Sequence, residues 1–209
     1  MPGRAAPLLT RLLPRRALLA CGLSAAAGLA GCARWRTATV PLRTIGAPLC
    51  QRAAQTLIVL LPGIDSAPEE FLREGFVQSV QAAGLAADVL LVDAHFGYYR
   101  GRSIVDRLRD DVVWPARARG YRQVWLAGVS LGGLGALLYA RQQGDVEGLL
   151  LIAPYLGERL TALEIRNAGG LARWPGGSPA EQGEVDITIW RWLQDQANPA
   201  SLGRKLPVL

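Results

Sequence analysis

The sequence predicts an α/β protein built on a doubly wound, largely parallel sheet. Short, wholly apolar runs alternate with segments that repeat apolar residues at helical spacing, and no hairpin turn joins two of these runs. A strand that is apolar along its whole length is typical of a parallel sheet covered by helices on both faces. The 209 residues, half of them hydrophobic, suit one domain with a sizeable core.

The expected elements follow one another in a regular order. Four apolar runs predict strands at 56–61, 87–93, 123–129 and 146–154. Helical spacing predicts helices at 66–84, 103–115 and 134–142, with Pro115 kinking or ending the second, and 94–102 is expected to be a loop. After the last strand we expect a helix at 160–167, a loop at 169–183, a helix at 187–196 and the start of another strand at 206–209.

The first 31 residues have the features of an export signal. A basic stretch up to Arg16 precedes a run of small apolar residues that is too short to span a bilayer comfortably. Leu-Ala-Gly-Cys at 29–32 resembles the lipobox of bacterial lipoproteins, in which the signal is cut before the cysteine and the cysteine carries a lipid. The resemblance implies lipidation of Cys32 and anchoring to a membrane of the bacterial envelope, on the periplasmic side. Position 33 is alanine and not an acidic residue that would retain a lipoprotein at the inner membrane, so this protein could also be placed in the outer membrane. The alternative interpretation is a plain signal peptide without lipidation.

The charge of the mature chain is nearly balanced. Four of the 23 basic residues lie in the first 31 residues, which leaves 19 basic against 17 acidic residues, or +2 in place of +6. Basic residues do not cluster with interleaved aromatics, so nucleic-acid binding is not expected. We therefore expect a signal peptide at 1–31, a tether at 32–55 with room for an irregular early strand, and a folded domain at 56–209, in which 157–203 form a lid region.

Gly128-Val129-Ser130-Leu131-Gly132 fits the G-x-S-x-G pattern of a nucleophile elbow. A serine at a strained turn between strand and helix needs small neighbours, and glycines flank Ser130 at two-residue spacing. With the apolar strand before it and the apolar helix after it, the motif makes residues 56–209 resemble the α/β-hydrolase family. The resemblance implies a serine hydrolase that cleaves a small-molecule acyl ester or thioester through an acyl-Ser130 intermediate, without a cofactor.

The resemblance also implies an oxyanion hole. One donor would be the backbone N–H of Leu131, and the second would come from the loop after the first apolar strand. That loop contains Gly63 and Ile64, and either can supply the second N–H. Tryptophans in the lid region either line an acyl pocket or attach the lid to the core; they are Trp174, Trp190 and Trp192.

The general base is the difficult part of the site, because the family orders its triad as serine, acid and histidine, and no histidine follows Ser130. The first explanation is a fragment that ends as the strand at 206–209 begins, with the acid and histidine still to follow. The second is that His95, after a strand that we expect to adjoin the elbow strand, is the base and is oriented by Asp93; Glu158 is a candidate acid. The third is a lipid-anchored scaffold or binding protein without hydrolytic chemistry. One histidine and scattered acids do not make a metal site.

Overall fold

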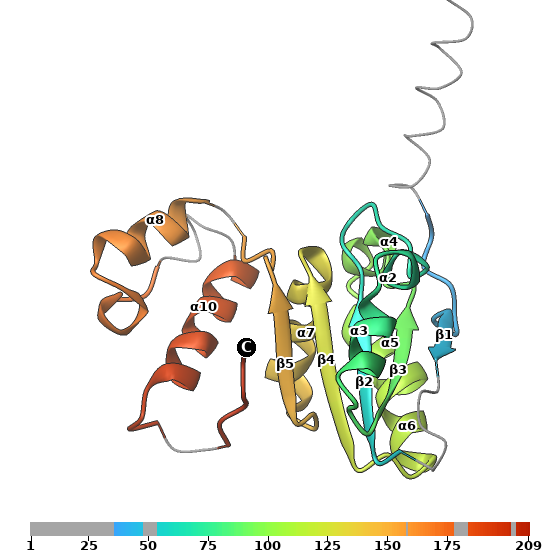
Figure 1. Ribbon diagram of the computed structural model, residues 1–209. Coiled ribbons are helices and arrows are strands. Elements are labelled where there is room, and N and C mark those ends of the chain that lie inside the picture. The colour runs from blue at the N-terminus through green and yellow to red at the C-terminus, as the bar shows by residue number, and fades with distance from the viewer. Residues whose placement is uncertain (1–35, 48–53, 158, 178–183, 202–203) are drawn as a thin grey trace, which may run out of the picture.

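The computed structural model describes residues 36–47, 54–157, 159–177, 184–201 and 204–209. Five strands form one sheet in the order β1-β3-β2-β4-β5 (Figure 1). The strands are β1 (Thr44–Ala47), β2 (Thr56–Leu61), β3 (Ala87–Val92), β4 (Gln123–Val129) and β5 (Gly148–Ile152). Strands β2 to β5 pair in parallel, whereas β1 pairs antiparallel to β3. The predicted fold class, a mostly parallel α/β sheet, is confirmed.

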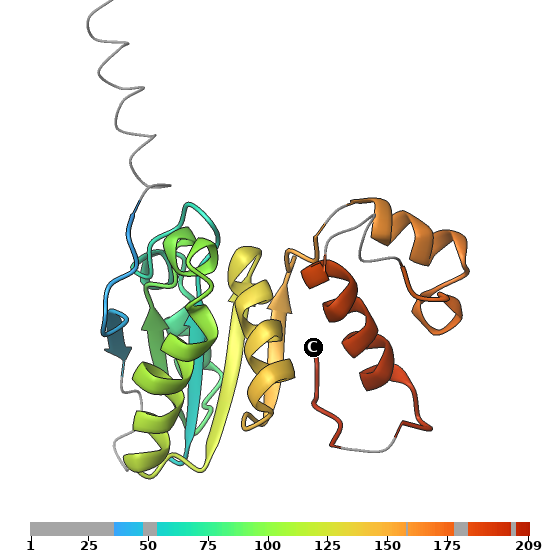
Figure 2. The same cartoon turned by 180° about the vertical axis from the view of Figure 1, so that it is seen from behind.

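Helices cover both faces of the sheet (Figures 1 and 2). They are α2 (Glu70–Arg73), α3 (Phe76–Ala82), α4 (Phe96–Arg100), α5 (Ile104–Leu108), α6 (Trp114–Ala118), α7 (Leu131–Gln143), α8 (Arg159–Asn167) and α10 (Glu184–Ala197). A π-helix, Arg109–Val113, joins α5 to α6, and a 3-10 turn, Leu171–Arg173, follows α8.

Alternate side chains of each strand enter two different cores. Leu57, Val59 and Leu61 of β2 pack with α5, α6 and α7 in the larger core, and Ile58 and Leu60 pack with α2 and α3 in the smaller one. Burial of apolar surface contributes about 25 cal/mol per Å², so these two layers supply most of the stabilisation of the sheet. Strands buried on both faces explain why the sequence shows continuous apolar runs here.

Four predicted elements differ in the structure. Gly75 adopts φ 76, a left-handed conformation, and divides the single helix expected at 66–84 into α2 and α3. Pro115 does not end its helix, because it lies in the first turn of α6, where its missing N–H is tolerated. The loop expected at 94–102 contains α4, and α7 begins at Leu131, three residues earlier than expected.

The segment predicted as a tether is partly folded. Residues 44–47 form β1, and Leu42 is buried in the larger core. The folded part of the chain therefore includes residues 36–47 and does not start at Thr56. The early strand was expected without bounds because β1 has no apolar run. The export signal and Cys32 lie outside the described residues. Within the described part of the chain, no helix is long and apolar enough to cross a membrane.

The region after β5 packs partly on itself and partly on the larger core. Trp174 and Trp190 form a small cluster with Ile165 and Ile187, while Trp192 of α10 packs on the larger core. Of the three tryptophans, only Trp192 therefore attaches the lid region to the larger core, which is the second of the two roles expected for them; Trp174 and Trp190 hold the lid region together. Residues 206–209 return to β5 in a parallel bridge between Val208 and Leu149, as the predicted strand start requires.

Candidate active site

Ser130 lies at the carboxyl end of β4 with φ 51 and ψ −113. A positive φ at a residue other than glycine costs of order 1–3 kcal/mol and persists only where the surroundings enforce it. Here the Ser130 N–H donates to the Ile152 carbonyl at 3.0 Å, and the Ser130 carbonyl accepts from the N–H groups of Tyr155 at 2.9 Å and Gly133 at 3.0 Å. The strained turn is thus held by α7 and by the end of β5.

Both glycines of the motif are required by close backbone contact. A Cβ on Gly132 would lie 2.1 Å from the Leu61 carbonyl oxygen, and one on Gly128 would lie 2.4 Å from the carbonyl carbon of Gly132. Neither contact can be relieved by rotating a side chain, because the opposing atoms belong to the backbone. The N-terminus of α7 therefore rests directly on the end of β2.

This contact brings the loop after β2 beside Ser130. A Cβ on Gly63 would lie 3.8 Å from the Cβ of Ser130. The Gly63 carbonyl accepts from the Ser66 N–H at 3.2 Å, which closes a turn with Ile64 inside it. Leu131, the first residue of α7, follows Ser130 directly and is buried. The structure thus gathers Ser130 and the three predicted oxyanion residues at one edge of the sheet.

A hollow opens beside this loop. It has a volume of about 180 Å³, and its lining includes Gly63, Phe71, Phe76 and Val129. It adjoins a larger apolar groove of about 380 Å³ that shares Phe71, Phe76 and Val129 and continues along the face of β4 and β5 to Ile152. Both hollows reach Val129, the residue before Ser130, but Ser130 itself is not among the residues that line them.

His95 is placed away from the elbow strand. The expectation that its strand adjoins the elbow strand is wrong, because β2 lies between β3 and β4. Neighbouring strands are about 4.8 Å apart, so β3 and β4 are separated by about 10 Å. The His95 ring is buried, its Nδ1 accepts the Gly97 N–H at 3.1 Å, and its centroid lies 4.6 Å from that of Tyr98. The side chain caps α4.

Asp93 does not orient His95. Both of its carboxylate oxygens accept from the guanidinium of Arg36, with 2.9 Å between Oδ1 and Nη1. Burial, followed by the nearby charge of Arg36, lowers the pKa of His95 below its usual 6.5, while the Asp93 carboxylate opposes this shift. The ring is therefore kept neutral, as its capping role requires. Nothing in the local sequence marked Arg36 as the partner of Asp93.

The remaining predicted site residues are not tested by the geometry. Glu158, the candidate acid, and Cys32, the candidate lipid attachment site, lie outside the described residues. Among the residues that are described, no group of three or more His, Cys, Asp and Glu side chains is arranged to hold a metal ion.

The chain has the α/β-hydrolase fold. In this fold a serine lies on a strained strand–helix turn at the carboxyl edge of a mostly parallel sheet. The loop after the neighbouring strand, here β2, lies beside that serine. It is similar to the mature form of a Bacillus licheniformis lipase, with 18% identity, 79% of this chain and 69% of that one covered, and a TM-score of 0.47. It is also similar to a phospholipase/carboxylesterase from Dyadobacter fermentans, with 18% identity, 58% and 63% covered, and a TM-score of 0.44. A predicted CIB-like hydrolase from Thermoplasma acidophilum has 17% identity, 54% and 63% covered, and a TM-score of 0.42.

No family model and no curated protein matches the sequence. The chain spans between 63% and 69% of the length of the three solved structures that it resembles. These likenesses carry no conclusion about activity, because one fold hosts many functions.

Proposed function

We propose that this protein is a serine hydrolase that cleaves a carboxylic ester or thioester through an acyl-Ser130 intermediate. The observation that carries the proposal is the strained backbone of Ser130, which β5 and α7 enforce beside the Gly63 loop. Strain of this kind is retained where it serves a function, and a serine raised at the carboxyl edge of a parallel sheet lies where substrates bind.

The chemistry follows from the placement of the backbone. Ser130 Oγ attacks the carbonyl carbon of the ester, and its proton passes to a base and then to the leaving alcohol. Negative charge develops on the carbonyl oxygen, where the N–H of Leu131 and that of Gly63 or Ile64 would stabilise it together with the positive end of α7. Water then cleaves the acyl-serine, which releases the acid and restores the hydroxyl. Capping of α4 by His95 argues against this histidine as the base.

The site is tested by labelling the folded, full-length protein with a fluorophosphonate, which reacts with activated serines. We expect labelling that Ser130→Ala abolishes and that Ser79→Ala, the loss of an exposed hydroxyl on α3, leaves intact. A folded protein that is not labelled would overturn the proposal and favour the catalytically inactive, lipid-anchored scaffold. Unchanged ester turnover in His95→Asn would exclude His95 as the base, whereas its loss would restore that assignment.

We also propose that Cys32 carries a lipid and holds the protein at a membrane of the bacterial envelope, on the periplasmic side. The support is the Leu-Ala-Gly-Cys sequence at 29–32 after a basic and then apolar leader. Cys32→Ser should move the protein from the membrane fraction to the soluble fraction and abolish incorporation of radioactive fatty acid. Membrane association that survives this substitution would contradict the anchor.

A further inference from the structure

The first described residues are fastened to the same edge of the sheet that carries Ser130. Asp93 follows the carboxyl end of β3 directly, and its buried carboxylate holds the guanidinium of Arg36. The backbone of Arg36 also lies against α4, because a Cβ on Gly97 would lie 2.1 Å from the Arg36 carbonyl oxygen. Arg36 is therefore fixed in place and does not trail from the domain.

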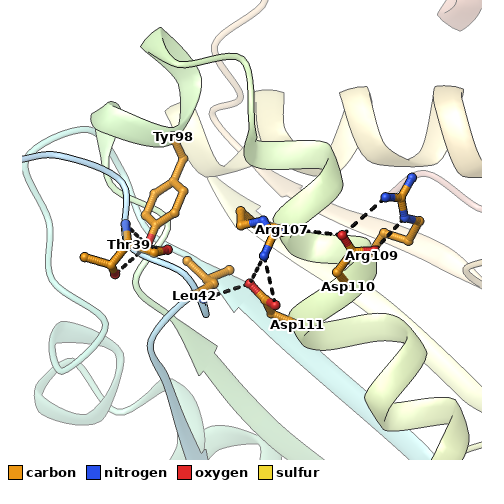
Figure 3. A network of polar contacts seen from close by, with 7 residues as sticks. All are labelled: Thr39, Leu42, Tyr98, Arg107, Arg109, Asp110 and Asp111. Carbon is orange, nitrogen blue, oxygen red and sulfur yellow. Dashed lines mark hydrogen bonds and ion pairs between the residues drawn. The ribbon is translucent and has the colours of Figure 1, made fainter.

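The residues that follow Arg36 are fixed as well (Figure 3). The Tyr98 hydroxyl donates to the Thr39 carbonyl at 3.0 Å and lies 3.2 Å from the Thr39 N–H, which donates to it. The Leu42 N–H donates to Asp111 Oδ2 at 2.8 Å, and the Leu42 side chain is only 3% exposed. The chain then enters β1. The segment 36–47 is thus part of the rigid domain.

This attachment shortens the expected tether severely. A free tether over the 24 residues of 32–55 could extend by about 80 Å, at roughly 3.5 Å per residue. Cys32 is only four residues from Arg36, which limits the separation of their Cα atoms to about 14 Å. The interfacial layer of one bilayer leaflet is itself about 5–8 Å thick. A lipid on Cys32 would therefore bring this edge of the sheet to the membrane surface.

Exposed apolar side chains gather at the same edge. Among the described residues, five large side chains that are between 36% and 62% exposed lie in loops, at helix starts or at the end of β5 on this side of the sheet: Ile64, Ile152, Tyr155, Leu160 and Val185. Figures 1 and 2 place α8 and the start of α10 at the end where the arrowheads of the parallel strands lie. In the described part of the chain, the other exposed large apolar side chains are Val40, Leu85, Trp114 and Leu209. A concentration of exposed apolar groups is typical of an interaction surface.

We propose that this edge rests on the membrane and that the substrate of Ser130 is an ester of a lipid held in the bilayer. The proposal rests on the proposed hydrolase function and on lipidation of Cys32. Lifting an acyl chain into water costs about 0.8 kcal/mol for each CH₂ group, so a serine that faces the interface avoids a large penalty. Ser130 Oγ would take the acyl group, the lipid alcohol would leave with the proton, and water would release the fatty acid.

The orientation can be measured without any turnover. In the lipidated full chain with Cys50→Ser, a fluorophore is attached at Leu160→Cys or at Leu85→Cys, two exposed leucines at opposite edges of the sheet. In vesicles that contain lipids with brominated acyl chains, we expect at least threefold stronger quenching at position 160 than at position 85. Equal quenching, or stronger quenching at position 85, would overturn the orientation.

The substrate class is tested by lengthening the tether. A 20-residue Gly/Ser insertion between Trp35 and Arg36 should lower turnover of a long-chain fluorogenic ester carried in the same vesicles at least fivefold. Turnover of a soluble short-chain ester by this variant should stay unchanged. As a control, the same insertion between Asn198 and Pro199, in an exposed turn, should change the turnover of neither ester. Unchanged turnover of the vesicle ester after the first insertion would overturn the proposal. If the uninserted protein hydrolyses neither ester, the hydrolase function fails, while the quenching still decides the orientation.

Discussion

The two flanks of the sheet are closed in different ways. On one flank β1 pairs with β3 over four residues, and buried polar contacts from Asp93 and Tyr98 fasten the preceding segment. On the other flank residues 206–209 meet β5 in a single parallel bridge, with backbone hydrogen bonds of 2.7–3.0 Å. The first flank is held by buried side chains, Asp93 and Tyr98. The second is held by backbone contact, by the apolar packing of α10 and by mostly exposed side-chain hydrogen bonds of Arg204, Lys205 and Gln196.

The two flanks hold different parts of the molecule in place: one holds the turn at Ser130 and the other holds the N-terminal segment. The strained turn at Ser130 is held by Ile152 and Tyr155, which belong to the lightly closed flank. The position of the N-terminal segment is held by Asp93 and Tyr98, which belong to the firmly closed flank. Substitutions at the elbow should therefore change the fold and the serine, whereas substitutions around Asp93 should chiefly change how the N-terminal segment is held.

The largest effect is expected at the elbow. Gly132→Ala would force a Cβ to within 2.1 Å of the Leu61 carbonyl oxygen, and because the opposing atom is backbone we expect a cost near the upper end of the usual overpacking range, about 3 kcal/mol. Gly46→Ala in β1 is the matched control, because a Cβ there would have no atom within 4 Å. Urea unfolding should show a large loss of stability only for Gly132→Ala, together with loss of fluorophosphonate labelling. Equal stability of the two variants would contradict the close contact.

The sequence predicted those parts of the fold that depend on local pattern. The strands β2 to β5 follow from continuous apolar runs, and the elbow follows from Ser130 with its two glycines in the required context. Strand β1 was expected only as an irregular strand without bounds, because its residues alternate between exposed and half-buried and its pairing with β3 is a tertiary contact. Helix α4 was missed because its start depends on capping by His95, which is not a usual capping residue.

The site shows the same limit. Gly63 was correctly expected beside Ser130, because the carboxyl ends of parallel strands share one edge. His95 was expected too close to Ser130, because the order of strands in a sheet cannot be read from the order of strands in the chain. Arg36 was not expected at all, since an ion pair between residues 57 positions apart leaves no periodic trace in the sequence.

The next largest effect is expected from Asp93→Asn on the firmly closed flank. The substitution removes a buried carboxylate that accepts two hydrogen bonds from Arg36. Because the Arg36 guanidinium is half-exposed, the free energy of unfolding should fall by only about 1–2 kcal/mol. Limited proteolysis should then cut within 36–43 faster. Glu69→Gln, which removes an exposed partner of Arg43, is the control and should change neither stability nor proteolysis. A Glu69→Gln effect as large as that of Asp93→Asn would remove the distinction between buried and exposed pairs.

A smaller effect is expected from Tyr98→Phe. The variant loses the hydrogen bonds between the Tyr98 hydroxyl and the backbone of Thr39, which should cost about 1 kcal/mol. Tyr99→Phe removes a buried hydroxyl that has no hydrogen-bond partner in the described part of the chain, so its stability should be unchanged or slightly higher. Thermal unfolding of the two variants compares them directly. A loss in Tyr99→Phe equal to that in Tyr98→Phe would show that the contact with Thr39 contributes nothing.

The smallest effect concerns the pH dependence of the same flank. The pKa of His95 is lowered in the folded state. At a pH below 6.5 the unfolded chain therefore binds more protons at this site than the folded chain does. The free energy of unfolding consequently falls as the pH drops from about 7 toward the folded-state pKa. Protonation would also remove the Nδ1 acceptor that caps α4 through Gly97. His95→Asn keeps a capping oxygen but cannot titrate, so its loss of stability between pH 7.5 and 5.5 should be smaller by up to about 1 kcal/mol. Carboxylates contribute equally to both proteins, so parallel urea-unfolding curves across this range would mean that His95 is not held neutral by its burial.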